Sequence, residues 1–291
     1  MRARAYDTAR AGWGFAAPGL VTLAIVMGIP LVYALAISLS SMTMLRPQLR
    51  LVGLDSFAAV MSEPLFWHSV LLTLRYSAMT VIGEFAIGLA VALMLRQVVA
   101  MRGVYFALLT LPMAMSPVAV ALIWRMLLQP NLGIVNQVLT GIGLPAVDWL
   151  GRSDLALTTV AWIDIWQQTS FVVLLLSAGL AALPKEPYEA AEVDGAGPFQ
   201  QFWYITLPLL RPVATIAIII QLINEFRTYD LVYVLTKGGP GVSTELLSYF
   251  AYRRAFQGLA VNEGNAAAFI LLLIVLSITV VFFYLLERRR A

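Results

Sequence analysis

The sequence has no cysteine and a single histidine, His68. The lack of cysteine excludes disulfides, thiolate metal sites and cysteine nucleophiles. One histidine is too few for a histidine-based metal site or a histidine-containing triad, and we predict no metal site. Neither of the two lysines, Lys185 and Lys237, stands in a Gly-rich phosphate-binding loop that ends in Gly-Lys-Ser/Thr. We therefore expect this chain to bind no cofactor and to have no enzymatic activity of its own.

Charge is scarce as well. Charged residues make up 12% of the chain and hydrophobic residues 60%, whereas a soluble domain usually carries about 25% charged residues. The deficit extends over the whole length, so we expect lipid to replace water around most of the surface. The predicted fold class is all-α: a polytopic membrane protein with one transmembrane domain over 1–291, no internal repeat and no nucleic-acid partner.

Six apolar segments are long enough to cross a bilayer. A helix rises about 1.5 Å per residue, so a crossing takes roughly 20 apolar residues. The predicted spans cover 13–38, 70–95, 104–128, 155–181, 212–235 and 265–286. The fifth is ambiguous, because Glu225, Arg227 and Asp230 interrupt its apolar run.

Charge at the two ends predicts the orientation. Three arginines precede the first span and three follow the last, namely Arg2, Arg4, Arg10, Arg288, Arg289 and Arg290. The positive-inside rule places both ends in the cytoplasm, which requires an even number of crossings, so the fifth segment should cross. The first span could instead be a cleaved signal peptide, because Ala34-Leu35-Ala36 resembles a cleavage site. Its apolar run is about twice the length of a signal-peptide core, which favours a retained anchor.

The most informative stretch is the predicted cytoplasmic loop, residues 185–210. Pro187 suits the first turn of a short helix, and Gly195 can adopt the left-handed conformation that stops it. Pro198 can begin a second short helix, which Leu207-Pro208 is expected to end. The pattern therefore predicts a compact helix pair at the membrane surface.

This helix pair has two interpretations. It could lie on lipid as an interfacial amphipathic helix, but such helices favour lysine and arginine on the polar face. The loop instead carries Glu189, Glu192 and Asp194, which anionic lipid would repel. Docking into a groove of a partner protein is therefore the favoured interpretation.

Three motifs carry a specific resemblance. Glu-Ala-Ala, Asp-Gly-Ala-Gly and Ile-x-Leu-Pro resemble the "EAA loop" of permease subunits of ATP-binding-cassette (ABC) importers. The matching residues are Glu189, Ala190, Ala191, Asp194, Gly195, Ala196, Gly197, Ile205, Leu207 and Pro208. The segments 235–241 (Leu-Thr-Lys-Gly-Gly-Pro-Gly) and 130–136 (Pro-Asn-Leu-Gly-Ile-Val-Asn) resemble the carbohydrate-uptake branch, which includes the maltose and glycerol-3-phosphate permeases. The resemblance covers residues 13–287, nearly the whole chain.

The resemblance implies an ABC type I importer permease fold and a set of partners. In that family the first helix of the loop docks on an ATPase subunit, which places the expected coupling residues at Glu189, Ala190, Ala191, Asp194, Gly195 and Gly197. The implied partners are an ABC ATPase dimer that uses ATP and Mg²⁺, a second homologous permease and an extracytoplasmic solute-binding protein. A heterodimer of permeases is expected, although a homodimer stays open. The implied solute is a sugar or sugar-like molecule, and the implied location is the lipid of a bacterial inner membrane.

Polar residues inside the spans are the candidates for the solute path. A charge at the bilayer centre costs about 2.5–3.5 kcal/mol on insertion scales, so it tends to face a cavity or a partner. Spacings of three, four and seven place Asp164, Gln167 or Gln168, and Phe171 on one stripe of the fourth span. The resemblance extends the expected path to the set Asp164, Gln167, Gln168, Phe171, Glu225, Phe226, Arg227, Met113 and Pro117.

The residue types on this path differ from those of the maltose permease, which implies a different solute. The guanidinium of Arg227 would suit the oxygens of an anionic sugar derivative. The alternative is internal pairing: Arg227 could neutralise Glu225, Asp230 or Asp164, and the amides could simply tie helices together.

Other residues are expected to be structural. Glu84 in the second span is interpreted as a packing or capping charge, and Pro112 and Pro117 as the source of a kink in the third span. His68 is interpreted as a solvated loop or interface residue.

Two other classes of function are alternatives to an importer permease. An ion-coupled secondary transporter could relay protons through Asp164, Glu225 and Asp230. Such carriers are often built from two related halves, which this sequence does not show, and they have no use for a docking loop. An intramembrane enzyme has no recognisable catalytic constellation. The preferred prediction is the permease subunit of an ATP-driven importer.

Overall fold

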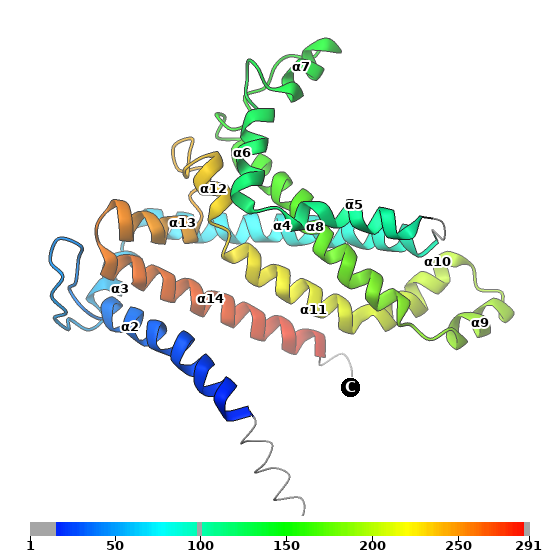
Figure 1. Ribbon diagram of the computed structural model, residues 1–291, viewed down its shortest axis with the longest axis horizontal. Coiled ribbons are helices and arrows are strands. Elements are labelled where there is room, and N and C mark those ends of the chain that lie inside the picture. Colours follow the sequence, from blue (N-terminus) through cyan, green and yellow to red (C-terminus); the bar gives the residue numbers. More distant parts are fainter. Residues whose placement is uncertain (1–15, 98–100, 288–291) are drawn as a thin grey trace, which may run out of the picture. The chain divides into compact units, whose positions relative to one another are not determined.

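The computed structural model describes residues 16–97 and 101–287 (Figure 1). Helices dominate this part of the chain, and its extended residues pair only at an isolated bridge between Ser40 and Leu51. The arginines at the two ends lie outside the described residues, so the predicted orientation stays a prediction.

Five helices of the described chain are long and apolar enough to cross a membrane, and a bent pair raises the number to six. The first runs over Ala16–Ser38 and contains η1 (Ala24–Gly28) and α2 (Ile29–Ser38). The others are α4 (Pro64–Gln97), α8 (Ala156–Ala181), the stretch Pro198–Leu235 and α14 (Val261–Glu287). Short helices α3 (Asp55–Met61), α7 (Ile134–Gly141) and α13 (Leu247–Tyr252), with the π-helical turn η3 (Arg253–Gln257), lie in the connections.

The third expected span is broken rather than kinked. It consists of α5 (Arg102–Ala114) and α6 (Pro117–Leu127), whose axes differ by 93° at the break. Pro117 occupies the first turn of α6, and Met115 and Ser116 are extended. The residue before a proline avoids the helical conformation, which explains why the helix stops at this point. Figure 1 shows α6 and α7 turned away from the direction of α5.

The loop and the fifth span differ from the sequence prediction. α9 (Glu186–Val193) is followed by a short connection. The next three elements, α10 (Pro198–Gln201), the π-helical turn η2 (Phe202–Thr206) and α11 (Leu207–Phe226), follow one another without a break. Leu207-Pro208 therefore begins α11 and does not end a short helix. The π turn explains the difference: Leu207 donates its N–H to the carbonyl of Phe202, so the change of hydrogen-bond register falls where Pro208 lacks a donor.

The fifth span is interrupted further along. It leaves the helix at Arg227–Tyr229 and resumes as α12 (Asp230–Leu235). The polar run that made this segment ambiguous in the sequence thus marks a real break in the helix.

The described chain forms two compact units. The first comprises residues up to 64 and 251–270. Inside it, Arg254 pairs with Glu63 and approaches Glu263 at 3.5 Å, and Asn262 donates to Ser56 Oγ at 3.0 Å. These contacts tie α3 to the start of α14.

The second unit comprises residues 65–250 and 271–291, and it holds the candidate site. One side of its interior is a core between α4, α8 and α11, formed by Ala92, Val172, Leu176, Leu180, Leu210 and Ala214. Glycines allow this close packing: a Cβ on Gly88 would lie 2.6 Å from Val172 Cγ1, and one on Gly179 would lie 2.9 Å from Val213 Cγ1. Small residues at helix contacts are typical of membrane proteins, where close packing replaces the hydrophobic drive between helices.

Candidate functional site

A polar cavity of about 310 Å³ opens where α8 faces the break between α11 and α12. It is lined by Pro117, Asp164, Gln167, Gln168, Asn224, Arg227, Thr228, Tyr229, Asp230 and Leu231. Small-molecule sites usually measure about 300–1,000 Å³. The cavity therefore has room for a small polar solute, and its walls carry both amides and charges.

The structure brings five of the expected path residues to this cavity: Pro117, Asp164, Gln167, Gln168 and Arg227. The broken helices explain the arrangement, because backbone groups freed at a break need partners. Gln167 supplies one of them: its Nε2 donates to the carbonyl of Met115 at 3.0 Å. One amide of the predicted stripe thus ties α8 to the α5–α6 break while it lines the cavity.

Arg227 is the residue on which the two sequence interpretations diverge. Among the described residues, no carboxylate lies within ion-pair distance of its guanidinium. Its backbone N–H closes the end of α11 on the carbonyl of Asn224 at 2.9 Å. Internal neutralisation by Glu225, Asp230 or Asp164 is therefore not what this structure shows.

Four expected path residues lie elsewhere. Met113 and Phe171 do not line the polar cavity. Phe226 is buried and borders an apolar cavity of about 430 Å³ together with Phe85 and Phe282. Glu225 also stays outside the polar cavity, because one residue along a helix turns the side chain by about 100° from Asn224.

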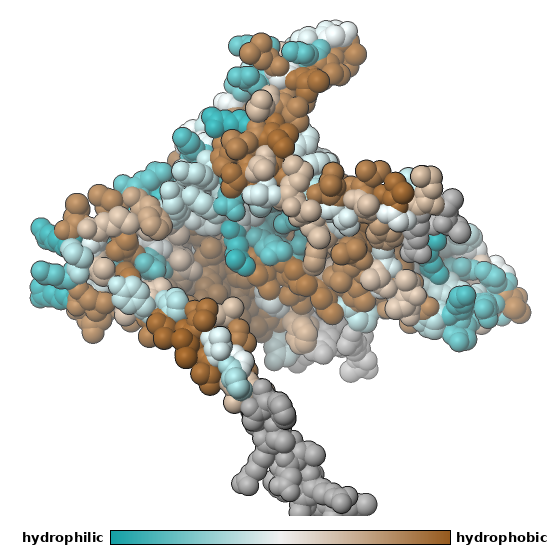
Figure 2. Space-filling model, in the orientation of Figure 1, coloured by the Kyte–Doolittle hydropathy of each residue, from teal (hydrophilic) through white to brown (hydrophobic). Residues whose placement is uncertain are grey.

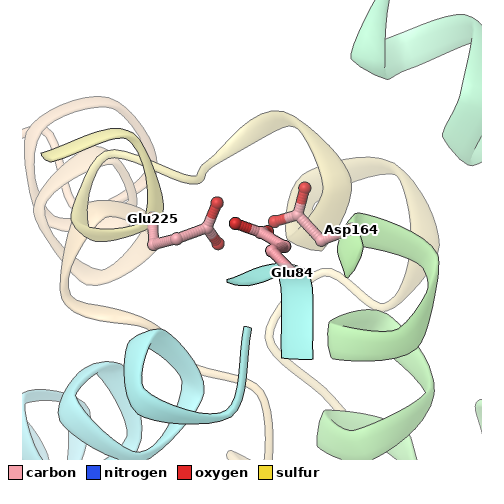
Figure 3. A group of neighbouring side chains, drawn as sticks. All are labelled: Glu84, Asp164 and Glu225. Atoms are coloured by element: carbon pink, nitrogen blue, oxygen red, sulfur yellow. The ribbon is translucent and has the colours of Figure 1, made fainter. Parts of the chain in front are cut away.

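Glu225 belongs instead to a cluster of three buried carboxyl groups, with Glu84 and Asp164. Figure 3 shows the three groups pointing toward one another from α4, α8 and α11. One carboxyl oxygen from each lies within 4.8 Å of the others, and the residues are 0%, 3% and 1% exposed for Glu84, Asp164 and Glu225. Two unit charges at that separation would repel by about 3 kcal/mol at an effective dielectric constant near 20.

The carboxyl cluster and the polar cavity are connected at two places. At the first, Asp164 is a member of the cluster and also lines the cavity, and it accepts a hydrogen bond from the buried hydroxyl of Tyr76. On the other side, Asn224 Nδ2 donates to Gln221 Oε1 at 3.3 Å, and Gln221 Nε2 donates to Glu84 Oε2 at 2.7 Å. The cluster is therefore part of the polar interior that the cavity opens into.

The sequence alone did not predict that Glu84, Tyr76 and Gln221 belong to the site. Glu84 was interpreted as a packing or capping charge, yet it sits in mid-helix with no terminus nearby, and Gln221 bonds only one of its oxygens. A signal did exist: Gln221 and Glu225 are four residues apart in an apolar run, and so point the same way from α11.

Another apolar cavity measures about 660 Å³. It lies among α5, α6 and α8, and its aromatic walls include Trp124, Trp149, Trp162 and Trp166. The rings of Trp124 and Trp166 meet edge to face at 5.6 Å. Figure 2 shows apolar side chains gathered over α5 and α6. Trp162 and Trp166 thus line the apolar cavity and not the polar one.

The predicted coupling residues lie on and just after α9, and none of the residues of α9 is buried. Gly195 follows the helix with φ of +77°, the left-handed conformation that the sequence predicted. Large apolar side chains also face outward here: Val193 is 89% exposed, Tyr204 80% and Phe199 75%. A groove of about 320 Å³ runs between the two helical parts, past Asp194, Gly195 and Tyr204.

The loop is joined to the spans through Tyr188. The Arg96 guanidinium at the end of α4 lies 4.7 Å above the Tyr188 ring. The Tyr188 hydroxyl donates to Thr206 Oγ1 at 2.9 Å, just before α11. One tyrosine of α9 thus contacts the ends of two helices that carry the carboxyl cluster.

Residues 84–290 match the family described as "binding-protein-dependent transport system inner membrane component". The chain belongs to this family. It is a multi-pass membrane permease of an ABC importer, and in this family ATP is hydrolysed by a separate subunit. The resemblance read from the loop motifs is thereby confirmed, and the comparisons give no support to an ion-coupled carrier.

Individual relatives agree. The chain is 36% identical over 247 residues to a trehalose/maltose transport system permease protein of Thermococcus litoralis, covering 85% of this chain and 84% of the relative. It is 32% identical over 257 residues to a sulfoquinovosyl glycerol transport system permease protein of Agrobacterium fabrum, covering 87% and 83%.

A solved chain confirms the predicted fold class. It comes from a bacterial alginate ABC transporter in complex with a pentasaccharide-bound periplasmic protein, and it superposes with a TM-score of 0.84 at 22% identity. The match covers 98% of this chain and 96% of that one. At this identity the likeness concerns the fold.

Proposed function

We propose that this chain is the permease subunit of an ATP-driven importer for a sugar-like solute that carries an anionic group. The observation that carries the anionic part is Arg227, a guanidinium at the wall of a polar cavity with no carboxylate partner among the described residues. A guanidinium binds carboxylate, sulfonate or phosphate oxygens through paired N–H donors. The curated relatives named for trehalose/maltose and sulfoquinovosyl glycerol transport support the sugar-like part.

The cavity offers the remaining groups that such a solute needs. Gln168 and Asn224 supply amide donors and acceptors, and Asp230 accepts from sugar hydroxyls. The Tyr229 ring lines the cavity as part of an aromatic stack, with the Tyr233 ring at 5.4 Å and the Tyr249 ring at 6.2 Å. Asp164 is engaged by Tyr76 and by the carboxyl cluster, so it acts mainly as the floor of the site.

Besides this chain, the assembly that we propose has four kinds of participants. A dimer of ABC ATPase subunits docks on Glu189, Ala190, Ala191, Asp194, Gly195 and Gly197 of the exposed α9 segment and uses ATP with Mg²⁺. A second, different permease completes the path and covers apolar surface beside α5 and α6. A solute-binding protein delivers the solute from outside, and the lipid is that of a bacterial inner membrane.

The continuous helix from Pro198 to Phe226 gives this assembly a mechanical route. Closure of the ATPase dimer moves α9, and Tyr188 connects α9 to Thr206 at the root of α11. α11 ends at Arg227, on the cavity wall. Movement of the docking loop thereby changes the access to the solute site, as alternating access requires.

The test is solute uptake by the reconstituted importer with Arg227→Ala and Arg227→Lys. For an anionic sugar derivative such as a sugar sulfonate or a uronate, we expect uptake to fall at least about tenfold with alanine, equal to 1.4 kcal/mol or more, and less with lysine, which keeps the charge but loses the paired donors. Gln168→Ala is the matched comparison: it removes a neutral cavity group, so its effect should be similar for an anionic and a neutral solute, whereas that of Arg227→Ala should be confined to the anionic one. If a neutral polyol is the better solute and Arg227→Ala transports it as well as the parent does, the anionic part is wrong.

A further inference from the structure

The carboxyl cluster of Glu84, Asp164 and Glu225 holds buried oxygens that have no donor. Both oxygens of Glu225 and Oε1 of Glu84 lack a hydrogen-bond partner, although the two residues are 1% and 0% exposed. Figure 3 shows that these groups point into the space between the three side chains. Buried polar atoms are almost always satisfied in folded proteins, so these oxygens need either protons shared among the carboxyl groups or a bound cation.

No side chain of the described chain supplies positive charge to the cluster. None of the lysines or arginines that the structure describes pairs with the three carboxyl groups. His68 is engaged elsewhere, where its Nε2 lies 3.2 Å from the carbonyl of Val242. The neighbouring donors are neutral: the Tyr76 and Thr228 hydroxyls on Asp164 and the Gln221 amide on Glu84. These donors add no positive charge to the cluster.

The geometry suits one ion. Three oxygens that all lie within 4.8 Å of one another share a centre at most about 2.8 Å from each (4.8 Å divided by √3), close to the 2.3–2.6 Å of Ca²⁺–oxygen bonds. All candidate ligands are hard carboxylate oxygens, and the sequence has no cysteine to attract a soft metal. Three carboxylates against a single monovalent ion would leave two uncompensated charges, which favours a divalent cation.

We propose that Glu84, Asp164 and Glu225 bind one hard divalent cation of the Ca²⁺ class beside the solute cavity. The ion reaches the cluster from the cavity past Asp164, which lines both. Because the three ligands come from α4, α8 and α11, the ion joins the three helices that pack around Gly88 and Gly179. The lack of cysteine and the single histidine predicted no metal site, whereas the ligands of this site are carboxylates. The inference does not rest on the nature of the solute.

The experiment uses the assembled ATPase–permease complex in lipid nanodiscs, stripped with EDTA and kept free of nucleotide and of binding protein. Binding of ⁴⁵Ca²⁺ is measured at pH 7.5, together with the thermal unfolding midpoint over a CaCl₂ series. The variants are Glu84→Gln and Glu225→Gln, which keep the shape and remove one charge each. Asp230→Asn is the matched control, because Asp230 lines the same cavity outside the cluster.

We expect one saturable Ca²⁺ per chain in the parent and in Asp230→Asn, with at least tenfold weaker binding in both cluster variants. The unfolding midpoint of the parent should fall with EDTA and recover with CaCl₂ but not with choline chloride. This measurement keeps the proposal testable if the variants do not assemble. Absence of saturable binding to the parent, or equal binding by all four proteins, would overturn the proposal and leave shared protons to neutralise the cluster. Uptake of the solute is a separate measurement, so failure here leaves the proposed function standing.

Discussion

The docking loop and the three-helix interior place their chemistry in opposite ways. The loop carries its proposed coupling residues within nine consecutive positions, 189–197, on a segment whose first helix has no buried residue. The interior assembles Glu84, Asp164 and Glu225 from positions up to 141 residues apart and buries all three. A surface that binds another protein can be local in sequence, whereas a buried polar site requires several helices to face one another.

The largest expected effect comes from breaking the loop. Gly195→Asp forces a side chain into the left-handed region, and Glu189→Lys reverses a charge on the docking face. We expect uptake and solute-stimulated ATP hydrolysis to fall at least about tenfold, a coupling loss of 1.4 kcal/mol or more. The amount of permease in the membrane should stay near the parent level. Glu192→Lys is the matched control, with the same charge change on the same helix outside the motif. Equal loss in Glu189→Lys and Glu192→Lys would show that any charge reversal on α9 has this effect and would contradict a specific role of Glu189.

The second effect tests the interior. A Cβ on Gly88 would overlap Val172 Cγ1 at 2.6 Å, so Gly88→Ala forces α4 and α8 apart. Overpacking of this kind usually costs about 1–3 kcal/mol, and we expect a lower thermal unfolding midpoint for the purified complex. Gly103→Ala is the control, because a Cβ there meets nothing within 4 Å. A midpoint for Gly88→Ala at or above that of Gly103→Ala would contradict the close packing.

A smaller effect is expected at Tyr188, which connects the docking loop with the helices of the interior. Tyr188→Phe removes the hydrogen bond to Thr206 and keeps the ring under Arg96. A hydrogen bond contributes about 1 kcal/mol, so we expect the transport yield per ATP to fall about two- to fivefold while basal ATP hydrolysis stays constant. Tyr204→Phe on the exposed part of the loop is the control. If both variants behave like the parent, the link between α9 and α11 runs through the backbone.

The smallest effect lies in a connecting loop that belongs to neither region. Arg152 donates to Asp154 at 2.7 Å, and this hydrogen bond lowers the pKa of the Asp154 carboxyl below its ordinary value. A lowered pKa stabilises the fold above the ordinary value near 3.8, and the contribution disappears as pH falls through the lowered pKa. Both side chains are exposed, so Arg152→Gln should shift the unfolding midpoint at pH 7 by no more than the scatter between replicates. A clear shift that persists in 1 M salt would contradict this assignment.

Much of the fold could be predicted because it rests on local or compositional signals. The apolar runs placed the spans close to the observed helices, and Gly195 stops α9 as expected. Two details of the chain path could not be predicted from the sequence. Leu207-Pro208 was expected to end a helix, but the π turn before it carries the helix onward, because such a turn absorbs the missing N–H of a proline. The third span was expected to kink, and it turns by 93°.

Part of the candidate site could likewise be predicted from the sequence, and part could not. Helical spacing predicted one stripe of Asp164, Gln167 or Gln168, and Phe171. All of these except Phe171 line the polar cavity. Spacing could not exclude Phe226 and Glu225, because a three-residue stretch of helix points in three directions and only the neighbours decide which one faces the cavity.

The sequence by itself determined that the chain crosses a membrane, that it belongs with ABC importer permeases and where its exposed loop carries the coupling motif. These properties depend on composition and on contiguous residues. The tertiary structure decided that Arg227 has no carboxylate partner among the described residues and that Glu84 meets Asp164 and Glu225. Both facts depend on which faces of distant helices meet, and that choice is made by the packing of small residues such as Gly88 and Gly179 at the contacts between α4, α8 and α11.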